Sequence, residues 1–261
     1  MRNIKFSYFL ALVFVFTTIG TIWSQTKTSP SSNRRKIKVE KPDLESIREE
    51  TLNPKSPYYY PNLMEKYLKN DTVMTHDEFR HLYLGYMFQE DYDPYRESEY
   101  AKITDQLIQE GAPFDKIRYY AEMSLRDNPF DLLQMSFLVH ALKEKKKWMS
   151  AKIWEFRLEH ILAAIKSTGT GENIDNAWYV IYPSHEYNLV GLLGYEATDV
   201  DFVEPAYDHL IVKPNEETKL RLKDRAAKGF YFNVLIPTEQ YVLKHPENTE
   251  VIEVEVEDVD G

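Results

Sequence analysis

The chain contains no cysteine, and this absence excludes several kinds of site and of stabilisation. Disulfides, thiolate metal sites and attachment of a lipid to an N-terminal cysteine all require a thiol. The fold must therefore be held together by side-chain packing. Hydrophobic residues occupy 43% of the 261 positions, which is enough for a substantial core in one large domain or two small ones.

The chain also has no excess of positive charge, since 32 Lys and Arg residues stand against 42 Asp and Glu residues. The formal net charge is −10, whereas a general nucleic-acid binder needs a basic surface that releases counterions. A local basic cluster, Arg34 to Lys38, follows an apolar leader, and we interpret it as part of a solvated tether. We therefore expect no nucleic-acid partner.

The first 24 residues have the order of a secretory signal peptide. Met1 to Lys5 is short and basic, Phe6 to Ile22 is a continuous apolar run, and Ser24 is a small residue suited to the cleavage position. An uncleaved N-terminal anchor is the alternative, because the apolar run approaches the length that spans a bilayer. In both cases we expect an exported protein, in the periplasm or at the cell surface, with this segment as its membrane contact.

The stretch from Phe114 to Ile165 organises the helical part of the chain. Its apolar residues recur at the spacing of three successive amphipathic helices, the first of which ends at Asn128-Pro129. Helix, turn, helix, with a closing proline, resembles a degenerate tetratricopeptide-type (TPR-like) repeat, although lysines stand where that repeat has a glycine. A generic helical hairpin in a globular domain is the alternative. The residues that match the large and small positions of the repeat are Met135, Leu138, Leu142, Ala151 and Leu158.

The pattern changes to that of strands after the helical stretch. Gly229 to Ile236 is β-branched and aromatic, and Glu196 to Val203 and Tyr207 to Lys213 alternate as strands do. We predict an α+β fold, with a helical N-terminal two-thirds followed by a small antiparallel β-sheet with short helices. The predicted regions are a signal peptide at residues 1–24, a flexible tether at 25–41, a helical region at 42–166, a small α/β region packed on it at 167–246, and an acidic tail at 247–261.

Four segments in a fixed order carry a family resemblance, which spans about residues 42–242. The segments are MTHDEFRHLYLGYMFQEDYDPY, LRDNPFDL, STGTGENIDNAWYVIYPSHEYNLVGLLGY and KGFYFNV. Together they resemble an uncharacterised family of exported bacterial proteins, the domain of unknown function DUF4919. The resemblance implies an extracytoplasmic location and the order of helices followed by a sheet, and it implies no catalytic activity.

The loop from Glu90 to Tyr95 is the predicted binding site. Glu90, Tyr92, Asp93 and Tyr95 combine acidic and aromatic groups, which can bind a sugar, a cation or a protein partner. The alternative is a turn fixed by Asp93-Pro94, whose tyrosines pack into the neighbouring helices.

The catalytic signals are weaker. His185 and Glu186 follow Ser184, but the members of a catalytic triad normally come from separate segments, and the serine can simply cap a helix. We keep His185 and Glu186 as candidate catalytic residues. We expect no cofactor, because the chain carries neither a P-loop nor a Rossmann glycine pattern. We expect no metal, because His76 and His81 are five residues apart and fall on different faces of a helix.

These observations favour a non-catalytic binding or scaffolding module of the cell envelope, which presents a helical repeat-like face to a protein or peptide partner. The alternatives are an extracytoplasmic, hydrolase-like enzyme that uses His185 and an accessory protein that binds a glycan. A pocket in which His185 meets acids from other segments would favour the enzyme, and an open helical surface would favour the binding module.

Overall fold

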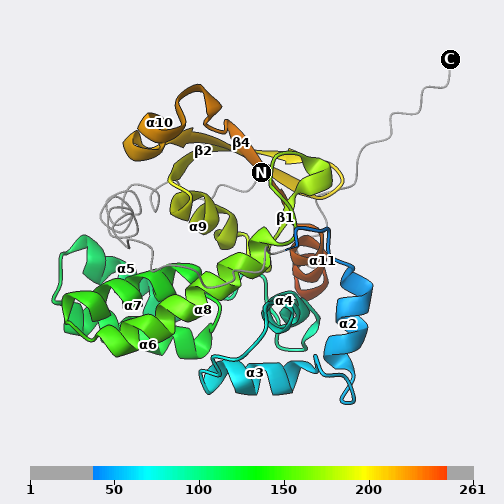
Figure 1. Cartoon of the computed structure of the whole chain (residues 1–261), viewed down its shortest axis with the longest axis horizontal. Helices are drawn as coiled ribbons and strands as arrows, with labels where there is room; N and C mark the ends of the chain where they lie inside the picture. The colour runs from blue at the N-terminus through cyan, green and yellow to red at the C-terminus, as the bar shows by residue number, and fades with distance from the viewer. Residues whose placement is uncertain (1–37, 246–261) are drawn as a thin grey trace.

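The computed structural model describes residues 38–245, which form a helical part followed by a sheet (Figure 1). The predicted signal peptide, the tether up to residue 37 and the predicted acidic tail lie outside these residues. Among the helices of residues 38–245, none is both long enough and apolar enough to cross a membrane.

The first helices begin where the sequence supplies side-chain caps. The side chain of Asp43 accepts a hydrogen bond from the Ser46 amide, and Thr75 and Glu78 form a capping box. These caps satisfy amide groups that have no partner inside the first turn. The elements of this part are α2 (Leu44–Leu52), α3 (Tyr60–Leu68), α4 (His76–Gly85) and the 3-10 turn η2 (Tyr86–Phe88).

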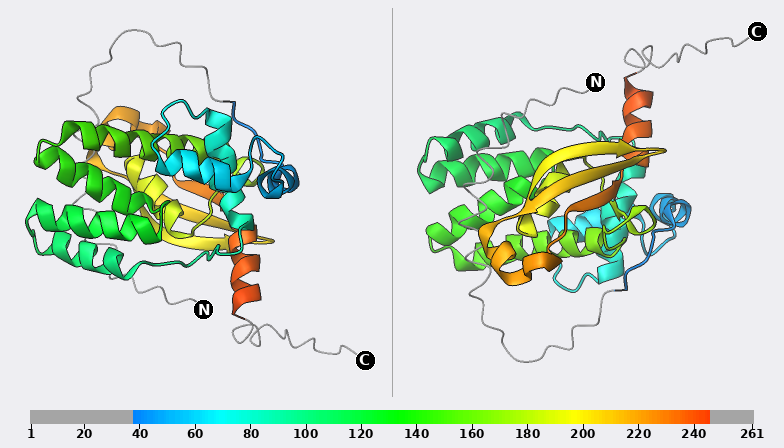
Figure 2. Two further views of the ribbon diagram at one scale, coloured as in Figure 1. Left: turned by 90° about the horizontal axis from the view of Figure 1, so that it is seen from below. Right: turned by 90° about the horizontal axis from the view of Figure 1, so that it is seen from above.

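Four helices then follow in succession, and each packs against the next along the chain. Ser98 and Asp131 cap two of them, and Asn128 leaves the helical conformation before Pro129, as the sequence predicts. Figure 2 shows these helices lying together on one side of the molecule. They are α5 (Glu99–Gln109), α6 (Phe114–Asp127), α7 (Leu132–Glu144) and α8 (Trp148–Lys166).

The remaining elements build a four-stranded sheet across one face of the helical part, with α9 between the sheet and α7 (Figures 1 and 2). The strand order is β1-β4-β3-β2. The elements are η3 (Ile174–Asn176), β1 (Trp178–Tyr179), α9 (Ser184–Leu192), β2 (Tyr195–Val203), β3 (Tyr207–Pro214), α10 (Glu216–Leu222), η4 (Lys223–Arg225), β4 (Gly229–Asn233) and α11 (Leu235–Lys244).

The predicted α+β fold is confirmed, but the sheet is mixed rather than wholly antiparallel. β2 pairs with β3 and β3 with β4 in antiparallel fashion, whereas β1 runs parallel to β4, with Trp178 opposite Phe232. A parallel pair needs a crossover connection, here the whole segment from α9 to α10. The alternation of residues within one strand does not show which strand it pairs with or in which direction.

β1 covers only two residues of an apolar run that extends from Ala177 to Tyr182. After Tyr179 the backbone of Ile181 bonds to side chains instead of a strand: its amide donates to the Tyr83 hydroxyl, and its carbonyl accepts from the Tyr92 hydroxyl. The run is therefore apolar because it is buried, and only its first part belongs to the sheet.

The last helix begins two residues before Pro237. α11 starts at Leu235, whose amide donates to the Asn233 side chain, so Pro237 lies inside the first turn. A proline is tolerated there because its missing N–H would have no partner within the helix.

One large hydrophobic cluster extends from Ile47 in α2 to Val234 after β4, so the helices and the sheet share a core. Aromatic rings of α3, α4 and the α6–α7 turn meet near its centre, where Phe130 contacts Tyr67, Tyr83 and Tyr86. A smaller cluster holds α5 and α6 onto α7. Its members are Ile117, Phe137 and Ala141, with Leu107, Ile108, Phe114 and Leu133 packed against them.

Candidate functional site

The loop predicted as a binding site is divided by the structure between core and surface. Tyr92 is fully buried, its ring lies across that of Tyr86 at 5.4 Å between centroids, and its hydroxyl donates to the Ile181 carbonyl. Its backbone carbonyl accepts a hydrogen bond from Lys244 of α11. Tyr92 is thus a core residue and cannot present its ring to a partner, which corrects this part of the prediction.

The other predicted residues of the loop remain accessible. The Asp93 side chain accepts a hydrogen bond from the Tyr95 amide at 2.9 Å, which fixes the turn around Pro94. The Tyr95 ring is 38% exposed and lies across Tyr241 of α11 at 4.8 Å. Glu90 and Asp93 therefore border a surface that contains one exposed tyrosine instead of two.

His185 and Glu186 lie in the first turn of α9, and both side chains are buried, at 1% and 0% exposed. Ser184 is the first residue of the helix and forms no side-chain cap. The Tyr83 hydroxyl accepts a hydrogen bond from the Ile181 amide, and it lies at hydrogen-bonding distance, 2.8 Å, from Nδ1 of His185. Burial lowers the pKa of His185 to about 3, and the backbone of Phe130 opposes this shift only in part. The ring is therefore a neutral core group at physiological pH.

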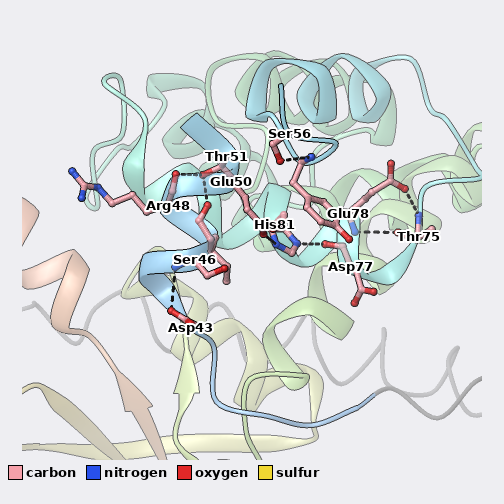
Figure 3. Close-up of polar contacts among 12 residues, drawn as sticks. Asp43, Ser46, Arg48, Glu50, Thr51, Ser56, Thr75, Asp77, Glu78 and His81 are labelled. Carbon is pink, nitrogen blue, oxygen red and sulfur yellow. Dashed lines mark hydrogen bonds and ion pairs between the residues drawn. The ribbon is translucent and has the colours of Figure 1, made fainter. Parts of the chain in front are cut away.

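His81 occupies a separate polar cluster between α4 and the end of α2 (Figure 3). Its Nδ1 lies 2.7 Å from the Asp77 carbonyl, its Nε2 lies 2.8 Å from a carboxylate oxygen of Glu50, and the Tyr58 ring stacks on it at 3.8 Å. Each ring nitrogen therefore has an oxygen partner within the fold. His81 consequently has no free nitrogen for a metal or for general base chemistry, and within residues 38–245 no group of three His, Asp or Glu side chains could hold a metal ion.

An open groove between α5 and α6 is a candidate ligand site. Its volume is about 500 Å³, within the range of sites that hold a small molecule or a few side chains. Ile103 and Leu107 lie one helical turn apart on α5, opposite Tyr119 and Tyr120 of α6. Ile103 is 37% exposed and Tyr119 is 53% exposed, so apolar and aromatic surface faces solvent here.

Polar groups form the rim of this groove. Gln106 donates to Glu110 at 2.7 Å along α5, and Asp115 at the start of α6 pairs with Lys145 at 2.6 Å. Lys116 is also exposed at the rim. An apolar floor with fixed polar groups at its edge is the usual composition of a recognition site.

Elsewhere on α5, the carboxyl group of Asp105 lies near Asp131 at the start of α7. The Gln134 side chain donates to Asp105 at 3.2 Å, and Asp131 caps α7 by accepting from the Gln134 amide. Burial, followed by the charge of Asp131, raises the pKa of Asp105 to about 7. Burial also raises the pKa of Asp131 to about 6. The contact between α5 and α7 therefore favours a protonated Asp105.

This contact predicts a stability that decreases as the pH rises. The folded-state pKa of Asp105 lies above its unfolded value, so folding takes up a proton between about pH 4 and pH 7, and this contribution is lost above pH 7. We expect Asp105→Asn to raise the free energy of unfolding by about 2 kcal/mol at pH 8, after allowance for partial exposure, and to have little effect at pH 4. Urea denaturation at both pH values measures this difference.

The matched control is Asp224→Asn, since that side chain is exposed and far from α5 in the sequence. We expect it to change stability equally at both pH values. An Asp105→Asn effect of the same size at pH 4 and pH 8 would show that Asp105 is ionised throughout and would remove the proposed titration.

Sequence reasoning did not identify the groove. The helical pattern assigns Tyr120 to the buried stripe of α6, together with Ile117 and Ala121, whereas Tyr120 lines the groove. One signal was available: Tyr119 is a large aromatic residue outside the buried stripe of its helix. The Glu50–His81 pair could not be found either, because its members come from different helices.

Comparison with known proteins gives one match. The family model described as Domain of unknown function (DUF4919) matches residues 45–242. No curated protein and no solved structure matches the chain.

Proposed function

The chain belongs to the DUF4919 family, a domain of unknown function, and on this premise we propose that it is an exported, non-catalytic binding module of the cell envelope. The groove between α5 and α6 is its binding site. The observation that carries the proposal is the exposed pair Ile103 and Tyr119 on facing helices above an apolar floor.

A peptide segment of a partner protein is the ligand that fits this groove best. The groove runs between α5 and α6. Its apolar residues are Ile103 and Leu107, one helical turn apart on α5, and the adjacent Tyr119 and Tyr120 on α6. An amphipathic peptide can place side chains between such residues while its polar face remains in water. The rim groups Gln106, Glu110 and Lys116 then offer both hydrogen bonds and charge to that face.

The hydrolase-like alternative has less support. His185 is buried and hydrogen-bonded to Tyr83, and both nitrogens of His81 are occupied. The glycan alternative shares the same tyrosines, because sugar rings also stack on aromatic faces. Soluble glycans are therefore included in the binding test.

Photo-crosslinking from the groove tests the proposal. A photoreactive phenylalanine analogue at position 119 is expected to give one discrete protein adduct in cells, because Tyr119 lies on the binding surface. The same analogue at position 202 is the control, since Phe202 is 57% exposed on β2 and Tyr119 is 53% exposed on α6. Purification of the adduct then gives a partner for binding measurements.

With that partner, we expect Tyr119→Ser and Ile103→Ser each to weaken Kd by about tenfold. Phe202→Ser should leave Kd within twofold. Equal adducts at positions 119 and 202, or no adduct at 119, would reject the peptide groove. If soluble envelope glycans bind the groove, Tyr119→Ser abolishes that binding, and no protein partner is found, the site would be assigned to the glycan alternative.

A further inference from the structure

The connection between α7 and α8 forms a second surface with unusual composition. Residues 143–152 contain five lysines in a chain whose net charge is −10. Trp148 and Met149 follow directly, at the start of α8, and are 56% and 75% exposed. Ile153 is 39% exposed one turn later. We call residues 143–153 the lysine–tryptophan tip.

The exposed groups of the tip lie on one side of α8. Positions 148, 149, 152 and 153 fall within an arc of about 140° on a helix of 3.6 residues per turn. Large apolar side chains and Lys152 therefore point to the same side. Segments that lie in a membrane interface combine apolar and basic side chains in the same way, and tryptophan is enriched in them.

Several charges of the tip remain available. Lys143 pairs with Glu155, and Lys145 pairs with Asp115. Lys146, Lys147 and Lys152 are exposed and form no ion pair with the residues of the described range, although Lys147 acts on Asp115 at longer range. Glu144 is the exposed acid within the tip, so its unpaired charge is positive on balance.

The backbone at Lys146 adds an independent observation. Its φ angle is +56°, and the amides of Lys146 and Lys147 donate to the carbonyls of Lys143 and Leu142, which closes α7. Glycine is the residue that adopts this left-handed conformation without strain. The chain carries a lysine where a glycine would be more stable, so the position supplies a charge at the expense of stability.

From these observations we propose that the lysine–tryptophan tip docks the protein on an anionic lipid surface. The lysines meet the headgroup phosphates, and Trp148 and Met149 enter the interfacial region. Charge complementarity selects this occupant, because the tip is a cationic surface on an acidic protein. The projecting apolar side chains distinguish a lipid surface from a soluble anion, which would leave them in water.

The position of the tip permits this contact. α8 has 19 residues and is therefore about 28 Å long, and its other end leads to the sheet. The described chain enters at that other end, where the Glu40 amide donates to the Ser167 carbonyl. The tip is thus separated by the length of α8 from the point at which any N-terminal anchor would attach, and it is a membrane contact beyond the leader.

Vesicle binding by the chain from Gln25 onward tests the proposal. This form keeps every described residue and removes the apolar run, which would bind lipid by itself. We expect sedimentation with vesicles of phosphatidylcholine and phosphatidylglycerol at 3:1, and binding at least tenfold weaker to phosphatidylcholine alone. The fluorescence of Trp148, taken as the difference from Trp148→Ser, should shift to the blue on binding.

Two variants separate docking from stability. The double variant Trp148→Ser/Met149→Ser is expected to weaken binding at least tenfold, whereas Phe202→Ser/Leu243→Ser, at 57% and 71% exposed positions, should leave it within twofold. Lys146→Gly should weaken binding about fivefold while raising Tm by about 2–4 °C. A purely structural turn would give the change in Tm without the change in binding.

The outcomes that overturn the proposal are equal binding by the tip and control variants, an unshifted Trp148 emission, or binding that does not depend on phosphatidylglycerol. The basic cluster from Arg34 to Lys38 is present in every protein compared, so its own attraction to the vesicles cancels. Circular dichroism of each variant establishes that the helices are intact. The test does not involve the α5–α6 groove, so its failure would leave the proposed peptide site standing.

Discussion

Acidification from pH 8 to pH 4.5 is expected to cost the protein about 3 kcal/mol of unfolding free energy at His185 alone. Burial lowers the folded-state pKa of this residue to about 3, whereas an unfolded histidine has a pKa near 6.5. Between these values the unfolded chain binds a proton that the folded chain excludes. The stabilisation is therefore complete above about pH 6.5 and is lost as the pH falls toward 3.

The measurement is urea denaturation of wild type and His185→Asn across this pH range. Asparagine places an amide oxygen near the position of Nδ1, so it can still accept the hydrogen bond from Tyr83, but it does not titrate. We expect the variant to be less stable at pH 8 by about 1–3 kcal/mol, because it leaves a cavity. Its dependence on pH should be shallower than that of wild type by about 3 kcal/mol.

The two curves should approach or cross near pH 4.5. Asp105 and the other acids titrate equally in both proteins, so the difference isolates position 185. Parallel curves would mean that His185 is accessible to water or protonated in the fold. That result would return it to consideration as a catalytic residue.

Replacement of Tyr92 by alanine should have the largest effect of any change in the predicted binding loop. The side chain is fully buried, contacts the rings of Tyr86 and Tyr182, and donates to the Ile181 carbonyl. Truncation of a buried aromatic side chain costs about 4 kcal/mol, which corresponds to a decrease in Tm of about 8–16 °C.

Tyr95→Ala is the matched control, three residues away in the same loop. Its ring is 38% exposed, and we expect a loss below about 1 kcal/mol. Thermal unfolding followed by circular dichroism measures both variants. A similar small loss for both would place Tyr92 at the surface and restore the loop as a binding site with two tyrosines.

Much of the helical part could be predicted because its signals are local. The break at Asn128-Pro129 appears at the predicted position, and the capping box of Thr75 and Glu78 and the cap at Ser98 are equally local features. Each depends on residues within one turn of one another. The edges of β2 and β3 were predicted within a residue for the same reason, since a hairpin alternates over a continuous segment.

The remaining features depend on contacts between distant segments. Whether Ile181 continues a strand is decided by the hydroxyl groups of Tyr83 and Tyr92, about 90 or more positions earlier in the chain. The groove depends on how α5 packs on α6, which decides that Tyr119 stays outside and Ile117 goes inside. A periodic pattern identifies the buried side of a helix, and it does not identify a gap between two helices.

The two sides of the fold should also form at different times. Each of α5 to α8 contacts its neighbour in sequence, so these helices close short loops and gain their contacts early in folding. β1 pairs with β4 across the whole α9–α10 segment, with residue 178 opposite residue 232. A slow step is therefore expected at the sheet. Until β4 has paired with β1, the apolar run after β1 is only partly buried. Refolding kinetics should show helical signal ahead of the burial of Trp178, and chaperones that recognise exposed apolar chain would find their target in that interval.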